Sequence, residues 1–209
     1  MLENYLLFIF MAFMLIILPG PDTAVITKNT ISKRKAAGLQ TTAGTLVALL
    51  IHTMAAVFGL SALIVKSAFL FSILKYAGAV YLIYLGCKSI LFIIKKQPQA
   101  ADDSVQVNKY GKETYFRQGF LTNLLNPKVA VFFLTFLPQF AGKSDHAFFE
   151  FLILGLTYTL LTMIWFFFYI YLIHFISDFM KKPSTMKAVE GLTGGVLILF
   201  GLKLALEKN

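Results

Sequence analysis

The chain has 209 residues, of which 58% are hydrophobic and 14% are charged, and its formal net charge is +9. A soluble domain carries about a quarter charged residues, so this deficit, with a mean hydropathy of +0.75, excludes an ordinary soluble domain and indicates a membrane protein. The single cysteine, Cys87, excludes an internal disulfide and a Cys-x-x-Cys redox or zinc site.

Six apolar segments are each long enough to cross a hydrocarbon core of about 30 Å, and they cover residues 5–27, 39–65, 68–94, 118–140, 147–175 and 186–206. They predict an all-α membrane protein with six transmembrane helices. Because Glu3 and no basic residue precede the first run, we interpret the N-terminus as the start of the first span rather than as a signal peptide.

The first segment is interrupted by the motif Leu-Pro-Gly-Pro-Asp at residues 18–22. A proline break frees backbone polar groups that hydrocarbon cannot satisfy, so such breaks persist where they line a cavity or lie inside protein. Gly20 lets a ligand approach the backbone, and amides freed at the start of the half-helix at Pro21 can bind a carboxylate. Asp22 is either a functional anion or a hydrated residue near the cytoplasmic end of its helix, close before Lys28.

The second segment contains His52 among apolar residues. A histidine titrates near neutral pH and can relay protons, so His52 is a proton-coupling candidate. Its alternative role is a hydrogen bond to a neighbouring helix. The third and sixth segments contain glycines, including Gly86 and Gly201, which allow close helix contact and permit a homodimer without requiring one.

The longest polar stretch, residues 95–117, is interpreted as a flexible cytoplasmic linker between two halves of three spans each. The distribution of Lys and Arg supports this orientation, because twelve lie in one set of alternate links and only three in the other. The basic set comprises the links 28–38, 95–117 and 177–187, and the opposite set holds Lys66, Lys143 and Lys208. By the positive-inside rule the basic links face the cytoplasm, so both termini are expected on the periplasmic or extracellular side.

The fourth segment is interrupted by Asn126-Pro127-Lys128. Asn123 and Asn126 add amide donors and acceptors that can bind both ends of a zwitterion, although an Asn before a Pro is also a good helix cap. Lys128 is either a cation that faces a substrate carboxylate or a residue that snorkels to the interface. Together with Asp22, it would give the two breaks opposite charges, one for an amine and one for a carboxylate.

The two halves resemble each other around the breaks. When Pro21 is placed on Pro127, identical residues also align at further positions: Leu18 with Leu124, Ala24 with Ala130, and Val25 with Val131. An odd number of spans per repeat inverts the second copy in the membrane, and the binding sites of such transporters lie between the repeats. We therefore expect two inverted three-helix repeats, residues 1–94 and 118–209, with helices 1 and 4 broken at the proline motifs.

The sequence contains no familiar motif for enzymatic chemistry. It has no His-Glu-x-x-His, Gly-x-Ser-x-Gly or phosphate-loop pattern, and no pair of intramembrane acids for proteolysis. We therefore expect no enzyme activity, no metal and no cofactor. Active transport by this chain would use an ion gradient or a separate subunit.

Short motifs follow one another along nearly the whole chain. In the first half they are Leu-Pro-Gly-Pro-Asp at 18–22, Lys-Arg-Lys-Ala-Ala-Gly at 33–38 and Tyr-Ala-Gly-Ala-Val-Tyr-Leu at 76–82. In the second half they are Phe-Arg-Gln-Gly-Phe at 116–120, Asn-Leu-Leu-Asn-Pro-Lys at 123–128 and Leu-Pro-Gln-Phe at 137–140. Together they resemble the LysE/RhtB family of bacterial amino-acid exporters. The resemblance implies a six-helix protein of the bacterial inner membrane that exports amino acids in exchange for protons, with its site at the two breaks.

The resulting hypothesis is secondary export of an amino acid or related small zwitterion by proton antiport, with proton and amine competing for Asp22. The substrate-binding candidates are Gly20, Pro21, Asp22, Asn123, Asn126, Pro127 and Lys128, and the proton-coupling candidates are Asp22 and His52. Two alternatives stay open, a passive pore or facilitator and a membrane scaffold without flux. The expected partners are the amino acid, protons and the lipid bilayer, and not nucleic acid, because the basic residues lie in the links.

Overall fold

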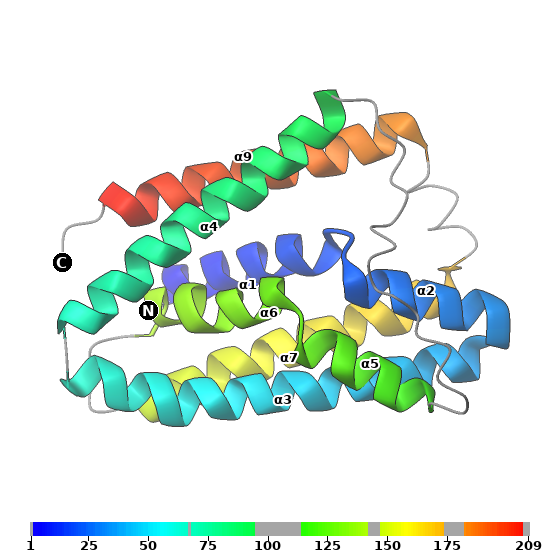
Figure 1. The fold of residues 1–209 in the computed structure, drawn as a ribbon, viewed down its shortest axis with the longest axis horizontal. Helices are drawn as coiled ribbons and strands as arrows, with labels where there is room; N and C mark the ends of the chain where they lie inside the picture. Colours follow the sequence, from blue (N-terminus) through cyan, green and yellow to red (C-terminus); the bar gives the residue numbers. More distant parts are fainter. Residues whose placement is uncertain (1, 67, 95–113, 142–146, 174–181, 207–209) are drawn as a thin grey trace.

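The computed structural model describes residues 2–66, 68–94, 114–141, 147–173 and 182–206, and all regular secondary structure within these ranges is helical (Figure 1). The longer helices are α1 (Leu2–Ile17), α2 (Pro21–Lys33), α3 (Lys35–Lys66), α4 (Ala68–Ile94), α5 (Tyr115–Leu124), α7 (Ala147–Tyr171) and α9 (Pro183–Leu206). A short helix α6 (Pro127–Val131) continues as the π-helical segment η1 (Phe132–Phe136) and the 3-10 turn η2 (Leu137–Gln139). The expected all-α class is confirmed for these residues, and most of the expected linker, residues 95–113, lies outside them.

Both proline motifs end one helix and begin another. α1 ends at Ile17 and α2 begins at Pro21, and the axes of these two helices differ by 54°. α5 ends at Leu124, and the helix that begins at Pro127 is bent from it by 48°. Each proline occupies the start of its helix, where its missing N–H breaks no intrahelical hydrogen bond. Backbone polar groups are thereby released at two points inside apolar stretches.

The helices form two outer layers with α1, α2 and α6 between them (Figure 1). α4 packs along α9 in one layer, and α3 packs against α7 and α5 in the other. The pairs α1–α2 and α5–α6 run in opposite directions, with α2 against α5. By length and apolar composition, Lys35–Gly59 and Ala147–Tyr171 can each cross a membrane, and each bent pair can do so as one broken span. The two breaks therefore meet inside the bundle.

Arg34 alone connects α2 to α3. The basic link expected at 28–38 is therefore helical except at this residue, because α2 continues to Lys33 and α3 begins at Lys35. Arg34 has φ 76° and ψ 169°, a backbone conformation that is found almost only at glycine. The charged composition of this stretch fits the exposed ends of two helices as well as it fits a loop, which is why composition alone suggested a longer connection.

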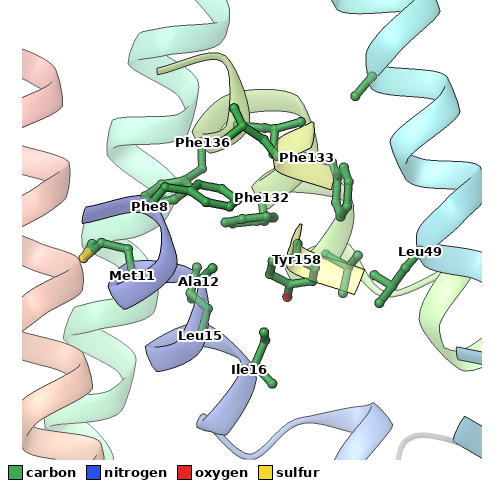
Figure 2. Packing of buried hydrophobic residues seen from close by; sticks show 14 of the residues in the cluster. Phe8, Met11, Ala12, Leu15, Ile16, Leu49, Phe132, Phe133, Phe136 and Tyr158 are labelled. Atoms are coloured by element: carbon green, nitrogen blue, oxygen red, sulfur yellow. The ribbon is translucent and has the colours of Figure 1, made fainter. Parts of the chain in front are cut away.

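Aromatic side chains pack together between α1, η1 and α7 (Figure 2). The ring centroid of Phe8 lies 6.2 Å from that of Phe132 and 6.5 Å from that of Phe136, both in η1. The ring centroid of Tyr158, in α7, lies 4.4 Å from that of Phe132. All four side chains are buried. This aromatic cluster joins α1, η1 and α7 through buried apolar surface.

The region between α2, α3 and α5 is more polar. The Nδ2 of Asn29 donates to the Oγ1 of Thr41 at 2.9 Å and to the Oε1 of Gln118 at 3.0 Å. α3 and α5 also cross at very short range, since a Cβ on Gly119 would overlap the backbone of Thr41 and a Cβ on Gly44 would overlap the backbone of α5. Two glycines therefore set the distance at which α3 and α5 pack.

Gly119→Ala should destabilise the protein, because the added methyl group would overlap the Thr41 carbonyl, and helix backbone cannot swing aside as a side chain does. We expect a loss of about 1–3 kcal/mol, measured as a lower midpoint of thermal unfolding in detergent. Gly59→Ala, on α3, is the matched control, since no atom of the described residues other than Gly59, its chain neighbours and its own helix backbone lies within 4 Å of its Cβ position. Equal losses in both variants would contradict the role of the α3–α5 crossing.

Candidate functional site

A small cavity lies where the two helix breaks meet. It offers about 20 Å³ to the centres of water molecules, which is room for one or two waters. Its polar lining includes Gly20, Asp22, Thr45, Asn123 and Lys128, and its apolar lining includes Leu15, Ile16, Leu49, Val129 and Phe166. Both broken pairs contribute to this lining, together with α3 and α7.

The carboxylate of Asp22 is held by two amides from the other half of the chain. The Nδ2 of Asn123 donates to the Oδ2 of Asp22 at 3.1 Å, and the Nδ2 of Asn126 donates to the same oxygen at 2.9 Å. The Oδ1 of Asp22 is buried and accepts no hydrogen bond from the part of the chain that the structure describes. One carboxylate oxygen is therefore bound by the protein, and the other has no protein donor.

Asn126 performs two tasks at the second break. Its Oδ1 accepts a hydrogen bond from the backbone N–H of Lys128 at 3.0 Å, which caps α6, while its Nδ2 donates to Asp22. The capping role and the polar-site role expected for Asn126 therefore belong to the same side chain. The first break differs, because the residue before Pro21 is Gly20, and no side chain caps α2.

The ammonium group of Lys128 points to the end of α1. Its Nζ donates to the carbonyl oxygen of Leu15 at 3.0 Å and to that of Leu18 at 3.1 Å, so it satisfies carbonyls at the end of a helix. A Cβ at Gly20 would lie 3.4 Å from this Nζ, so glycine leaves space for the lysine head. The charge of Lys128 also acts on the carboxylate of Asp22. The side chain of Lys128 is thus directed into the protein. A snorkelling lysine would instead extend to the membrane interface.

His52 lies beside Asn123 rather than in the cavity wall. Its Nε2 is 3.4 Å from the carbonyl oxygen of Asn123, and its ring stacks on Phe133 with 5.6 Å between the centroids. The structure therefore shows the contact to a neighbouring helix that was the alternative to a proton relay. Among the other predicted residues, Gly20, Asp22, Asn123 and Lys128 line the cavity, whereas Pro21, Asn126 and Pro127 adjoin it without lining it.

Thr45 is a lining residue that sequence reasoning missed. It follows Gly44, which brings α3 close to α5, and it lies one helical turn after Thr41. Hydroxyl groups repeated at helical spacing beside a glycine, in an otherwise apolar span, would have been the signal. The charged residues of the lining are Asp22 and Lys128, so the cavity presents one negative and one positive group. Within the described ranges, no three His, Cys, Asp or Glu side chains come together to hold a metal.

An all-helical protein whose charged cavity lies between two broken apolar helices has the architecture of a membrane transport protein. The chain belongs to the family of LysE type translocators, whose family model matches residues 13–208. It is 37% identical over 211 residues to the membrane protein YrhP of Bacillus subtilis (strain 168), a match that covers 99% of this chain and 100% of the relative.

The chain is also similar to proteins named for an amino acid. It is 28% identical over 204 residues to the leucine efflux protein of Enterobacter sp. (strain 638), with 97% of this chain and 95% of the relative covered. The leucine efflux protein of Salmonella typhi matches at the same identity, with 94% of the relative covered. No solved structure is significantly similar to the chain.

A double-mutant cycle should show that Asp22 and Lys128 are coupled. Lys128→Met leaves the carboxylate and the Leu15 and Leu18 carbonyls without their cation, so it should destabilise the protein more than Asp22→Asn does. The double variant should lose less stability than the sum of the single losses, by about 0.5–3 kcal/mol. Denaturant unfolding in detergent measures the free energy of unfolding of the wild type, the two single variants and the double variant. Strictly additive losses would contradict the coupling.

The two tasks of Asn126 can be separated by substitution. Asn126→Ser keeps an oxygen that can cap α6 but removes the donor to Asp22, whereas Asn126→Ala removes both. We expect Asn126→Ala to be less stable than Asn126→Ser by about 1 kcal/mol, the usual contribution of an N-cap. Thermal unfolding provides the comparison, and equal midpoints for the two variants would exclude a stabilising cap at this position.

Proposed function

We propose that the protein is a secondary transporter that exports neutral amino acids across the bacterial inner membrane in exchange for protons. The observation that carries the proposal is that Asp22 and Lys128, one from each proline break, line the same cavity. An amino acid presents an ammonium and a carboxylate on one carbon atom, and each would find an opposite charge there. Membership of the LysE type translocators and similarity to leucine efflux proteins support the same class of cargo.

In the proposed complex, the amine of the substrate faces Asp22 and its carboxylate faces Lys128. The start of α2 supports the second contact, because Gly20 provides no capping side chain. Backbone N–H groups at an uncapped helix start, with the helix dipole behind them, attract an anion. The carboxylate therefore has both a lysine and backbone donors within the same part of the cavity.

The substrate side chain would lie against the apolar part of the lining. Asp22 and Lys128 are already matched to the two backbone charges of an amino acid, and the lining offers no further charged residue. A substrate with a charged side chain would bring an uncompensated charge into an apolar space, which is costly. We therefore propose aliphatic cargo. The names of the leucine efflux relatives agree with that chemistry.

The proposal includes six spans arranged as two inverted repeats, residues 1–94 and 118–209, joined by a cytoplasmic linker at 95–117. Two features of the fold support it. Gly20 and Asn126 occupy matching cap positions before the matching prolines, and counterpart helices pack on each other, α3 on α7 and α4 on α9. With the basic links on the cytoplasmic side, both termini would lie on the opposite side.

Asp22 is the proposed site of proton coupling. Its Oδ1 can take a proton or accept a hydrogen bond from a substrate amine, and the two events exclude each other. The groups around the carboxylate are the amides of Asn123 and Asn126, the ammonium of Lys128 and the phenol of Tyr158. His52 is the second candidate, and its path to the cavity would run through Asn123.

Transport would require the cavity to expand and to open at its two ends in turn. Room for one or two waters is far too small for leucine, so the described conformation cannot hold this substrate. The aromatic cluster would separate on one side and the contacts of Asn29 on the other. The π-helical segment η1, which carries Phe132 and Phe136, is an irregular stretch of the kind that frequently occurs at functional sites.

Proteoliposomes loaded with labelled leucine and given a proton gradient test the proposal. We expect leucine efflux that is accelerated by the gradient and accompanied by proton entry, measured with a dye for the internal pH. Asp22→Asn should lose the dependence on the gradient, because an amide cannot carry the proton. Lys128→Met should weaken leucine binding by roughly 10–100-fold, the usual loss for a charged hydrogen bond. L-lysine and L-glutamate should not be exported.

Other results would overturn parts of the proposal. Leucine efflux that ignores the gradient would identify a facilitator, and a folded protein without flux for any amino acid would identify a scaffold. Unchanged pH dependence in Asp22→Asn would remove the coupling role of Asp22. Normal export by Lys128→Ala would show that Lys128 acts only on the end of α1.

A further inference from the structure

Three buried oxygen atoms of the cavity residues have no hydrogen-bond partner within the described part of the chain. They are the Oδ1 of Asp22, the Oδ1 of Asn123 and the Oγ1 of Thr45. All three residues line the one cavity described above. Buried polar atoms are nearly always satisfied, so three such oxygens on residues of one small cavity suit a ligand that donates hydrogen bonds.

The hydrogen bonds around Asp22 fix the direction of the Asn123 side chain. Its Nδ2 donates to the Oδ2 of Asp22, and a carboxylate accepts hydrogen bonds but does not donate them. While Asp22 is ionised the amide therefore cannot be reversed, and its Oδ1 remains an acceptor without a partner in the described part of the chain. Asn126 differs, because its Oδ1 is used by the backbone N–H of Lys128. Only one of the two amides thus presents an unsatisfied oxygen.

Thr45 supplies the third oxygen from a different helix. Its side chain is 1% exposed and that of Asn123 is 2% exposed. Other buried threonines of α3, Thr41 and Thr53, donate to the backbone carbonyl four residues earlier. The structure records no such bond for Thr45. Its hydroxyl is consequently available to a molecule in the cavity.

We propose that Thr45, Asn123 and Asp22 form a subsite for a primary ammonium group. A primary ammonium has three N–H donors, and these three oxygens offer one acceptor for each. The carboxylate supplies the opposite charge, and the hydroxyl and the amide replace the water that the ammonium loses. This inference rests on the proposed function, because it assigns the residues that would bind the amine of the amino acid. The choice of leucine as a probe rests on the same proposal.

The number of oxygens argues against a divalent metal ion, because Ca²⁺ takes six to eight oxygen ligands and Mg²⁺ needs a nearly ideal octahedron. A hydroxyl group in place of the amine would lack both the charge and two of the three donors. A quaternary ammonium would keep the charge but lack all three N–H donors. The subsite should therefore distinguish an amino acid from the corresponding hydroxy acid.

Binding to the purified protein in detergent, followed by calorimetry, tests the subsite without transport. The probes are L-leucine, 3-methylbutylamine, which is its skeleton without the carboxylate, and 2-hydroxy-4-methylpentanoate, which has a hydroxyl in place of the amine. We expect the two amines to bind and the hydroxy acid to bind at least about tenfold more weakly than leucine. Amine binding is also measured in sodium chloride and in choline chloride at equal ionic strength. The comparison shows whether Na⁺ competes for the same subsite.

Thr45→Val removes the hydroxyl and keeps the shape of the side chain, so it should weaken both amines by about tenfold or more. Thr45→Ser should bind nearly as the wild type does. Thr42→Val is the matched control, because Thr42 also has a buried Oγ1 without a partner, on the same helix, but does not line the cavity. Thermal unfolding without ligand verifies that each variant is folded.

Unchanged amine binding by Thr45→Val, or an equal loss in Thr42→Val, would overturn the subsite. So would a hydroxy acid that binds as tightly as leucine, sodium that competes with both amines, or a wild type that binds neither amine. Failure of the proposed function looks different. If 3-methylbutylamine binds and depends on Thr45 while leucine neither binds nor moves in vesicles, the subsite stands and amino-acid export falls.

Discussion

The carboxylate of Asp22 lies among apolar helices, where an uncompensated charge would cost several kcal/mol. All of the donors that the structure gives it come from the opposite half of the chain, the amides of Asn123 and Asn126, with the nearby charge of Lys128. Lys128 in turn holds the end of α1 through two carbonyl oxygens. Each half therefore supplies what the break in the other half lacks, and the two broken helix pairs are held together at their breaks.

Equivalent backbone positions carry different chemistry in the two halves. Gly20 and Asn126 both precede the proline that starts a helix, yet only Asn126 can cap it. The residues after the prolines are an acid in one half and a base in the other. Two helix starts that both carry a proline thus give an asymmetric cavity, which suits a ligand whose two ends differ.

The breaks were predictable because proline and glycine act locally, and the positions of Pro21 and Pro127 determine where the second helix of each pair begins. The meeting of Asp22 and Lys128 was only a hypothesis, since it depends on packing between segments far apart in sequence. Thr45 could not be identified, because Thr41, Thr53 and Thr162 satisfy their hydroxyls on their own helix backbone, and sequence does not show which threonine departs from that habit. Arg34 shows the same limit, because a charged residue gives no sign that it alone will turn the chain.

The small size of the cavity has a consequence for the proposed transport. A state with room for one or two waters holds no amino acid, so the proposed transporter would bind its cargo only in an expanded conformation. An expanded conformation populated at about 1% would weaken the apparent affinity for cargo by about 100-fold. Such weak binding suits a protein that acts when its cargo accumulates, because export would rise with concentration and cease before the cell lost its supply.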